Sequence, residues 1–128
     1  MNSKKLAKRI IYLILLILVV NFLANKLYWY YSVWYFDMIM HFLGGFWLGL
    51  AYIYLFSPAS VSMNLIFKIL LLVFLVGVGW EIYEILVNDI ITQNPFNFLD
   101  TISDILFDLA GGTLAMLYFS KRIMLQSK

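Results

Sequence analysis

The acidic residues and the single histidine of this chain fall at regular spacings inside otherwise apolar segments. Three pairs of these residues lie three or four positions apart: Asp37 and His41, Glu81 and Glu84, and Asp104 and Asp108. Residues at this spacing share one face of a helix. Carboxylates together with one imidazole suit Mg²⁺, Mn²⁺, Ca²⁺ or Zn²⁺. We therefore predict one polar site made of all three pairs, in which every member except Asp37 is a candidate ligand of a divalent cation.

Some of the acids also have ordinary structural explanations. Asp37 and Asp100 stand where helix N-caps are expected, and the Glu84 carboxylate can extend to the membrane interface. From a helical rise of 1.5 Å per residue, Glu81 and Asp108 lie about 12 Å below the outer mouth of the bundle, too deep for either explanation. A charged side chain at the bilayer centre costs ~2.5–3.5 kcal/mol or more. We expect these carboxyls either to share protons in hydrogen-bonded pairs or to be compensated by a bound cation.

The composition indicates that these residues belong to a membrane protein. Hydrophobic residues make up 64% of the 128 residues and charged residues 12%, against about 45–50% and about 25% in soluble domains. So few charged residues could not cover the surface of a small soluble domain. The absence of cysteine excludes disulfides, zinc–thiolate sites and thiol catalysis. The net charge of +2 gives no indication of a nucleic-acid partner.

Apolar segments of the length needed to cross a bilayer, roughly 20 residues, predict an all-α fold. Four spans are expected in a single membrane domain covering residues 1–128, at about 10–24, 37–56, 65–88 and 101–119. The connections contain Pro58 and Pro95, which favour turns. Residues 27–36 are rich in Tyr and Trp, and such rings favour the headgroup level of a membrane. We interpret 27–36 as an aromatic belt at the outer interface, with a ligand-stacking surface as the alternative.

The distribution of basic residues predicts the orientation. With four spans, eight of the nine Lys and Arg residues fall on one side, and only Lys26 falls on the other. Basic residues favour the cytoplasmic side, so both termini are predicted to be cytoplasmic, in the multi-pass topology of a bacterial cytoplasmic-membrane protein. All seven acids then lie in the outer half of the membrane. This second asymmetry was not used to set the orientation.

Small residues continue the acidic stripes toward the middle of the membrane. Small side chains let helices approach closely in lipid. We predict that six glycines pack the helices together: Gly44, Gly45, Gly49, Gly77, Gly111 and Gly112.

Three sequence blocks together resemble a known group of proteins. The first runs from Asp37 through His41 to Gly45, the second is the Trp80–Glu84 block, and the third is the acidic segment 99–112 that ends in a glycine pair. This set resembles the YjdF-like group of small bacterial membrane proteins and, more distantly, the VanZ-like family. The resemblance covers about residues 37–115, and it implies the same topology and the same polar residues.

The resemblance is closer to the YjdF-like group than to the VanZ-like family. Met38, Glu84 and Asp108 stand where VanZ-like proteins usually have Lys, Gln and often Asn. VanZ-like proteins are associated with low-level resistance to the glycopeptide teicoplanin. No biochemical role is implied by the YjdF-like resemblance itself.

Three functional hypotheses follow from the site. The leading one is a cation-dependent site at the outer leaflet that binds or acts on a cell-envelope lipid or a lipid-linked headgroup, with membrane lipids as further partners. The second is a proton or ion relay, which would require a homo-oligomer because the acids stop in the outer half. The third is a noncatalytic scaffold in which paired carboxyls hold the helices together. No nucleophile motif indicates an enzyme.

Overall fold

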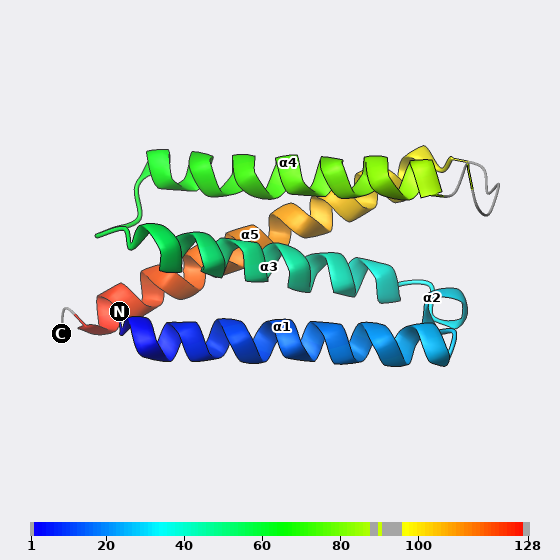
Figure 1. Ribbon diagram of the computed structural model, residues 1–128. Coiled ribbons are helices and arrows are strands. Elements are labelled where there is room, and N and C mark those ends of the chain that lie inside the picture. The colour runs from blue at the N-terminus through cyan, green and yellow to red at the C-terminus, as the bar shows by residue number, and fades with distance from the viewer. Residues whose placement is uncertain (1, 88–89, 91–95, 127–128) are drawn as a thin grey trace.

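The computed structural model describes residues 2–87, 90 and 96–126, and in this part of the chain it is a bundle of helices (Figure 1). The elements are α1 (Ser3–Lys26), α2 (Trp29–Ser32), α3 (Phe36–Phe56), α4 (Met63–Val87) and α5 (Phe98–Gln126). Four of them, all except α2, are long and apolar enough to cross a membrane. This confirms the predicted all-α fold with four spans. Asn88, the predicted end of the third span, lies outside the described residues.

Two helices begin earlier than the apolar pattern indicated, because an asparagine caps each of them. The Asn2 side chain accepts hydrogen bonds from the backbone N–H groups of Lys4 and Lys5, so α1 begins at Ser3. The Asn97 Oδ1 accepts the backbone N–H of Asp100 at 3.2 Å. Asn97 therefore caps α5, and the expected capping role of Asp100 is wrong: Asp100 lies inside the first turn.

The helices run lengthwise beside one another, and α5 crosses behind the others at an angle (Figure 1). The most extensive packing is between α3 and α5, while α4 packs chiefly on α5 and α1 packs on α3. Both ends of the chain lie at the same end of the bundle (Figure 1). The starts of α1 and α4 and the end of α5 share that end, and they carry Lys4, Lys68 and Lys121. We call it the basic end.

Glycines permit the close crossing of α3 and α5. A Cβ built on Gly45 would lie 2.0 Å from the backbone oxygen of Asp108, and one on Gly111 would lie 2.0 Å from the backbone oxygen of Phe42. A Cβ on Gly49 would lie 2.5 Å from the Cβ of Ala115. Only hydrogen in place of a side chain allows these approaches, which is the usual role of small residues between helices in lipid.

Two further glycines lie against α4 and α5, and one does not pack. A Cβ on Gly112 would lie 3.1 Å from a methyl group of Val73, and a Cβ on Gly77 would lie 2.6 Å from Asp108 Oδ2. Among the described residues, no atom outside the neighbouring part of α3 lies within 4 Å of a Cβ built on Gly44. Gly44 therefore makes no such close approach among the described residues, because its side of α3 faces away from the helix crossing.

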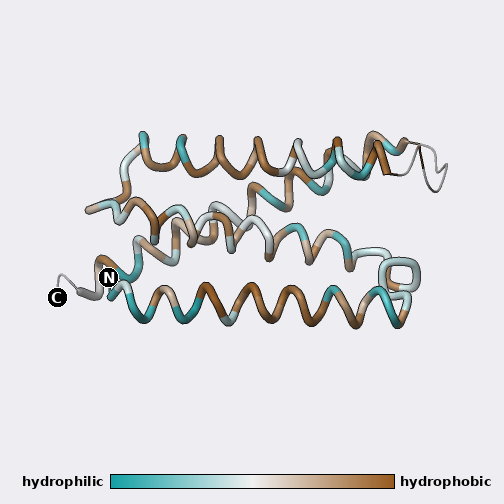
Figure 2. The backbone as a smooth tube through the Cα atoms, viewed as in Figure 1, coloured by the Kyte–Doolittle hydropathy of each residue, from teal (hydrophilic) through white to brown (hydrophobic). Residues whose placement is uncertain are grey.

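The interior differs between the two halves of the bundle. Toward the basic end it is an apolar core: Leu6, Ile10, Leu50, Ile53, Leu65, Ile69, Val73, Ala115, Met116 and Phe119. The Trp47 indole N–H donates to the backbone oxygen of Ile10 at 3.1 Å and ties α3 to α1 there. Figure 2 shows long hydrophobic stretches along the middle of α1 and in α4. Among the described residues, the buried charged side chains and His41 lie in the opposite half, toward α2.

The aromatic segment 27–36 contains the short helix α2, which the sequence pattern did not predict. Tyr31 and Trp34 are 86% and 79% exposed, so their rings face outward. Tyr30 turns inward instead and donates a hydrogen bond to Asn21 Oδ1 at 2.6 Å. Burial first, and then the charges of Asp37 and Glu84, raise the pKa of Tyr30 to about 12. Asp37, Glu81, Glu84, Asp104 and Asp108 all lie toward the end of the bundle beside α2, and we call it the acidic end.

Candidate functional site

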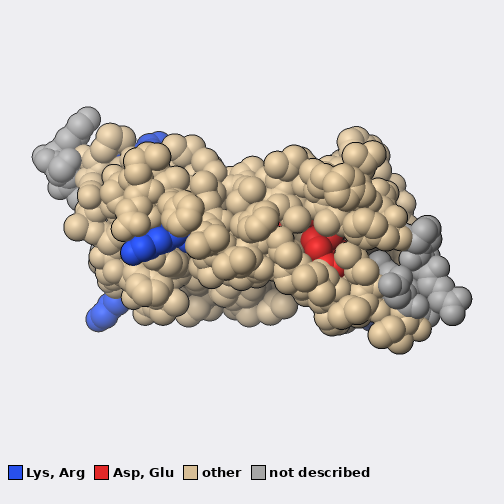
Figure 3. All heavy atoms as spheres, turned by 90° about the horizontal axis from the view of Figure 1, so that it is seen from above, with Lys and Arg blue, Asp and Glu red and all other residues tan. Residues whose placement is uncertain are grey.

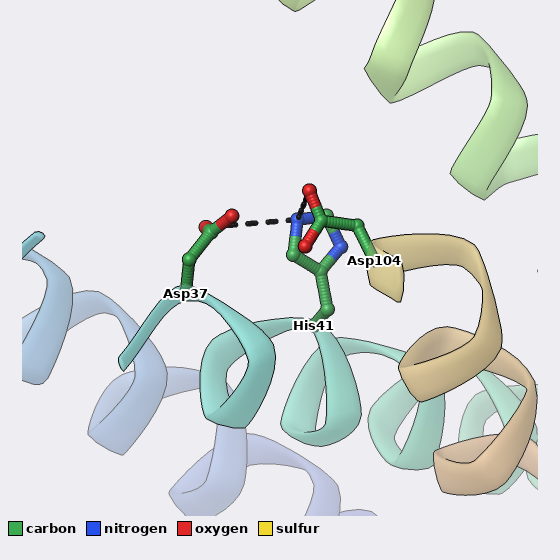
Figure 4. Close-up of side chains that lie close together, drawn as sticks. All are labelled: Asp37, His41 and Asp104. Atoms are coloured by element: carbon green, nitrogen blue, oxygen red, sulfur yellow. Dashed lines mark ion pairs between the residues drawn. The ribbon is translucent and has the colours of Figure 1, made fainter. Parts of the chain in front are cut away.

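His41 is the centre of a buried polar cluster at the acidic end. The α3 helix carries His41 one turn after Asp37, and the crossing of α3 and α5 places Asp104 against the ring (Figure 4). The His41 Nε2 lies 3.5 Å from Asp104 Oδ2, 3.7 Å from Asp37 Oδ1 and 3.8 Å from Glu81 Oε1. One imidazole nitrogen thus faces carboxylates from three helices. Within the described part of the chain, every ion pair involves this histidine.

Asp108 engages the other nitrogen of the ring. Its Oδ1 lies 3.1 Å from His41 Nδ1. An ionised Asp108 carboxylate can only accept a hydrogen bond, and in that state the His41 Nδ1–H is the donor. In the neutral ring, Nε2 then presents its lone pair to the other carboxylates. This arrangement is common among metal-binding histidines, whose second nitrogen is held by a carboxylate.

Several carboxylate oxygens in the cluster have no hydrogen-bond partner among the described residues. They are Glu81 Oε1, both oxygens of Asp104, and Asp108 Oδ2. Asp104 is 0% exposed and Glu81 is 4% exposed. A buried charge is costly unless it is paired, and a buried acceptor without a donor costs about 1–3 kcal/mol or more when charged. The arrangement is therefore stable only with compensation by protons or by a cation.

Two groups of side chains are arranged closely enough to share a cation. In the first, ligand atoms of Asp37, His41 and Asp104 lie within 4.8 Å of one another, and in the second, ligand atoms of Glu81, Glu84 and Asp104 do so. Asp104 belongs to both groups. The two groups contain five of the six predicted site residues, and they differ from the predicted ligand set by including Asp37. Asp108 belongs to neither group among the described residues, and its place beside Nδ1 makes it a partner of His41.

Glu84 connects the cluster to the outer surface of the bundle. Its Oε1 accepts a hydrogen bond from the Trp80 indole N–H at 2.9 Å, and the Trp80 side chain is 50% exposed. Figure 3 shows acidic atoms at the surface on the side of α4, with the basic residues visible in that view toward the other end. The sequence reasoning missed Trp80 as part of the site. Its position four residues before Glu84, on the same helical face, was the available signal.

The fold and the cluster define a class of protein: a four-span membrane protein with a buried carboxylate–histidine site in one half of the bundle. More particularly, the chain belongs to the family described as "Predicted membrane protein (DUF2238)", whose model matches residues 2–124. This membership is consistent with the YjdF-like resemblance, while the VanZ-like resemblance stays an expectation. No curated protein and no solved structure matches the chain significantly.

Proposed function

We propose that this protein binds a divalent cation at its acidic end and uses it to hold a phosphorylated lipid or lipid-linked headgroup at the outer leaflet. The observation that carries the proposal is Asp104, which is 0% exposed and whose carboxylate oxygens accept no hydrogen bond from the described residues. It lies beside further carboxylates and an imidazole nitrogen that is already oriented. Hard oxygen ligands with one imidazole favour Mg²⁺ or Mn²⁺, and they also suit Ca²⁺ or Zn²⁺.

A phosphate group is the ligand that best fits such a cation in a membrane. Mg²⁺ bound to protein carboxylates commonly keeps several water ligands, and phosphate oxygens of a substrate can take the place of these waters. Glu84 of the cluster accepts a hydrogen bond from Trp80, whose side chain is half exposed, so this pair of α4 residues connects the cluster to the surface. A headgroup can therefore approach from the membrane interface while its acyl chains stay beside the apolar helices. The apolar core toward the basic end favours binding over ion passage, because no charged residue continues the cluster through that core.

The outer location depends on the orientation of the chain, which cysteine labelling can test because the chain has no cysteine. We expect an impermeant thiol reagent added to intact cells to label Ser32→Cys and to leave Ser3→Cys and Ser60→Cys unlabelled. All three positions are exposed, and Ser32 is at the acidic end whereas the others are at the basic end. The positive-inside tendency places the basic end in the cytoplasm. Labelling at position 3 or 60 from outside would show the opposite orientation, with the site at the inner leaflet.

The cation itself is tested by the stability of purified protein in detergent. We expect one of Mg²⁺, Mn²⁺, Ca²⁺ or Zn²⁺ to raise the Tm and a chelator to lower it. A ligand that binds only the folded state stabilises it by about 2.7 kcal/mol at one hundred times its Kd. Asp104→Asn should abolish this shift, because it removes the charge that both ligand groups share. Asp100→Asn is the matched control: it is one turn earlier on α5, exposed, and absent from both groups.

The headgroup is tested on the same preparations. Dihexanoyl phosphatidic acid should bind the cation-loaded wild type and Asp100→Asn, and it should not bind chelated protein or Asp104→Asn in calorimetry. Inorganic phosphate serves as the comparison that separates a phosphate site from a lipid site. A Tm indifferent to all four cations and to chelator would refute the cation site and support the scaffold of proton-sharing carboxyls. Cation binding without binding of either phosphate compound would refute the headgroup role alone.

A further inference from the structure

We infer that the site holds two divalent cations, bridged by the carboxylate of Asp104. This inference rests on the proposed function, since it specifies how many ions the proposed cation site takes. The two ligand groups take their residues from different helices, apart from the shared Asp104. Asp37 and His41 come from α3, Glu81 and Glu84 come from α4, and Asp104 of α5 is the member common to both groups.

The geometry of each group follows from its helix. Asp37 and His41 are four residues apart and Glu81 and Glu84 are three apart, so each helix presents two ligands on one face. Asp104 lies between these faces, with its Oδ2 3.5 Å from His41 Nε2. Its two oxygens are buried and accept no hydrogen bond from the described residues. A carboxylate with both oxygens available can give one to each of two ions, and two-metal sites with ions about 3.5–4 Å apart are a recurring arrangement.

The charge balance supports two ions over one. The two groups contain four carboxylates, those of Asp37, Glu81, Glu84 and Asp104, and one neutral imidazole nitrogen. Two divalent cations neutralise these four carboxylates and leave only the charge of Asp108, whereas a single ion leaves two further negative charges in a largely buried cluster. Uncompensated charge in such a place is strongly unfavourable. Asp108 lies outside both groups and is engaged by His41 Nδ1, so it orients the ring of the first ion's ligand.

Two adjacent ions also specify the substrate class more closely. A pair of cations can hold two oxygens of one phosphate and stabilise the charge that develops on attacking and leaving oxygens. The site is therefore suited to a phosphate ester whose phosphorus lies between the ions. A headgroup joined to lipid through such an ester meets this requirement at the depth of the membrane interface.

The number of ions is measured with Mn²⁺ as the probe. We expect equilibrium dialysis of the purified protein to give two Mn²⁺ per chain, and electron paramagnetic resonance to show an exchange-coupled pair. Asp37→Asn and Glu84→Gln should each reduce the content to one ion and restore the six-line spectrum of isolated Mn²⁺. Each removes a ligand from one group and leaves the other group intact. Asp100→Asn should keep both ions and the coupling.

The possible outcomes separate this inference from the function on which it rests. One uncoupled Mn²⁺ per wild-type chain would overturn the two-ion site and leave the proposed cation site standing. No bound Mn²⁺, together with no response to the other three cations, would overturn both. Circular dichroism and gel filtration identify variants that fail to fold, and the wild-type stoichiometry and spectrum decide the question without them.

Discussion

Gly45→Ala is expected to destabilise the folded protein severely, whereas Gly44→Ala should be neutral or slightly stabilising. A Cβ at position 45 would lie 2.0 Å from the backbone oxygen of Asp108, and a backbone atom cannot rotate away as a side chain can. The helices must separate to admit it. Overpacking of this kind costs about 1–3 kcal/mol and more when the backbone has to move, so we expect a loss of about 3 kcal/mol or more. The measurement is the free energy of unfolding in mixed detergent micelles.

The neighbouring glycine makes this a sharp comparison. No atom lies within 4 Å of a Cβ at position 44, and alanine favours a helix over glycine by up to about 1 kcal/mol. The two variants differ by one position and have identical chemistry, and only Gly45→Ala is predicted to lower the free energy of unfolding. Equal stabilities would mean that α3 and α5 do not cross at Gly45, and the assembly of His41 with Asp104 and Asp108 would lose its structural basis.

Gly77→Ala is expected to weaken cation binding by about 10–100-fold while the protein remains folded. A Cβ there would lie 2.6 Å from Asp108 Oδ2, the end of a side chain that can rotate. Displacing this carboxylate removes the acceptor of the His41 Nδ1 proton. Loss of a partner that orients a ligating histidine typically costs 10–100-fold in metal affinity. The effect is measured by Mn²⁺ titration of the purified variant.

Gly79→Ala provides the matched control for this second comparison. It makes the same change two residues further along α4, where no atom lies within 4 Å of the added Cβ. Its Mn²⁺ affinity should equal that of the wild type. If Gly77→Ala binds Mn²⁺ as tightly as Gly79→Ala does, Asp108 has no part in orienting His41, and its proximity to the ring serves packing alone.

The amino-acid sequence by itself determined the class of fold, and it predicted which polar residues share a helical face. Long apolar segments have few ways to satisfy their backbone hydrogen bonds in lipid other than as helices, so composition and length sufficed for the four spans. Helical periodicity placed Asp37 with His41 and Glu81 with Glu84, because these are contacts within one helix. The helix ends were less accurate, since side chains outside the apolar runs, such as Asn2 and Asn97, decide where α1 and α5 begin.

The tertiary structure alone decided how the residues of different helices divide the site. The estimated depth along the membrane predicted that Glu81 faces Asp108. The structure instead places Glu81 in a ligand group with Asp104, and Asp108 contacts His41 Nδ1. The rotation of each helix about its axis and the angle at which α5 crosses α3 fix these partners. Both depend on close backbone contacts at Gly45 and Gly111. A periodic pattern gives the face of a helix, but only packing between helices determines which atoms on that face meet.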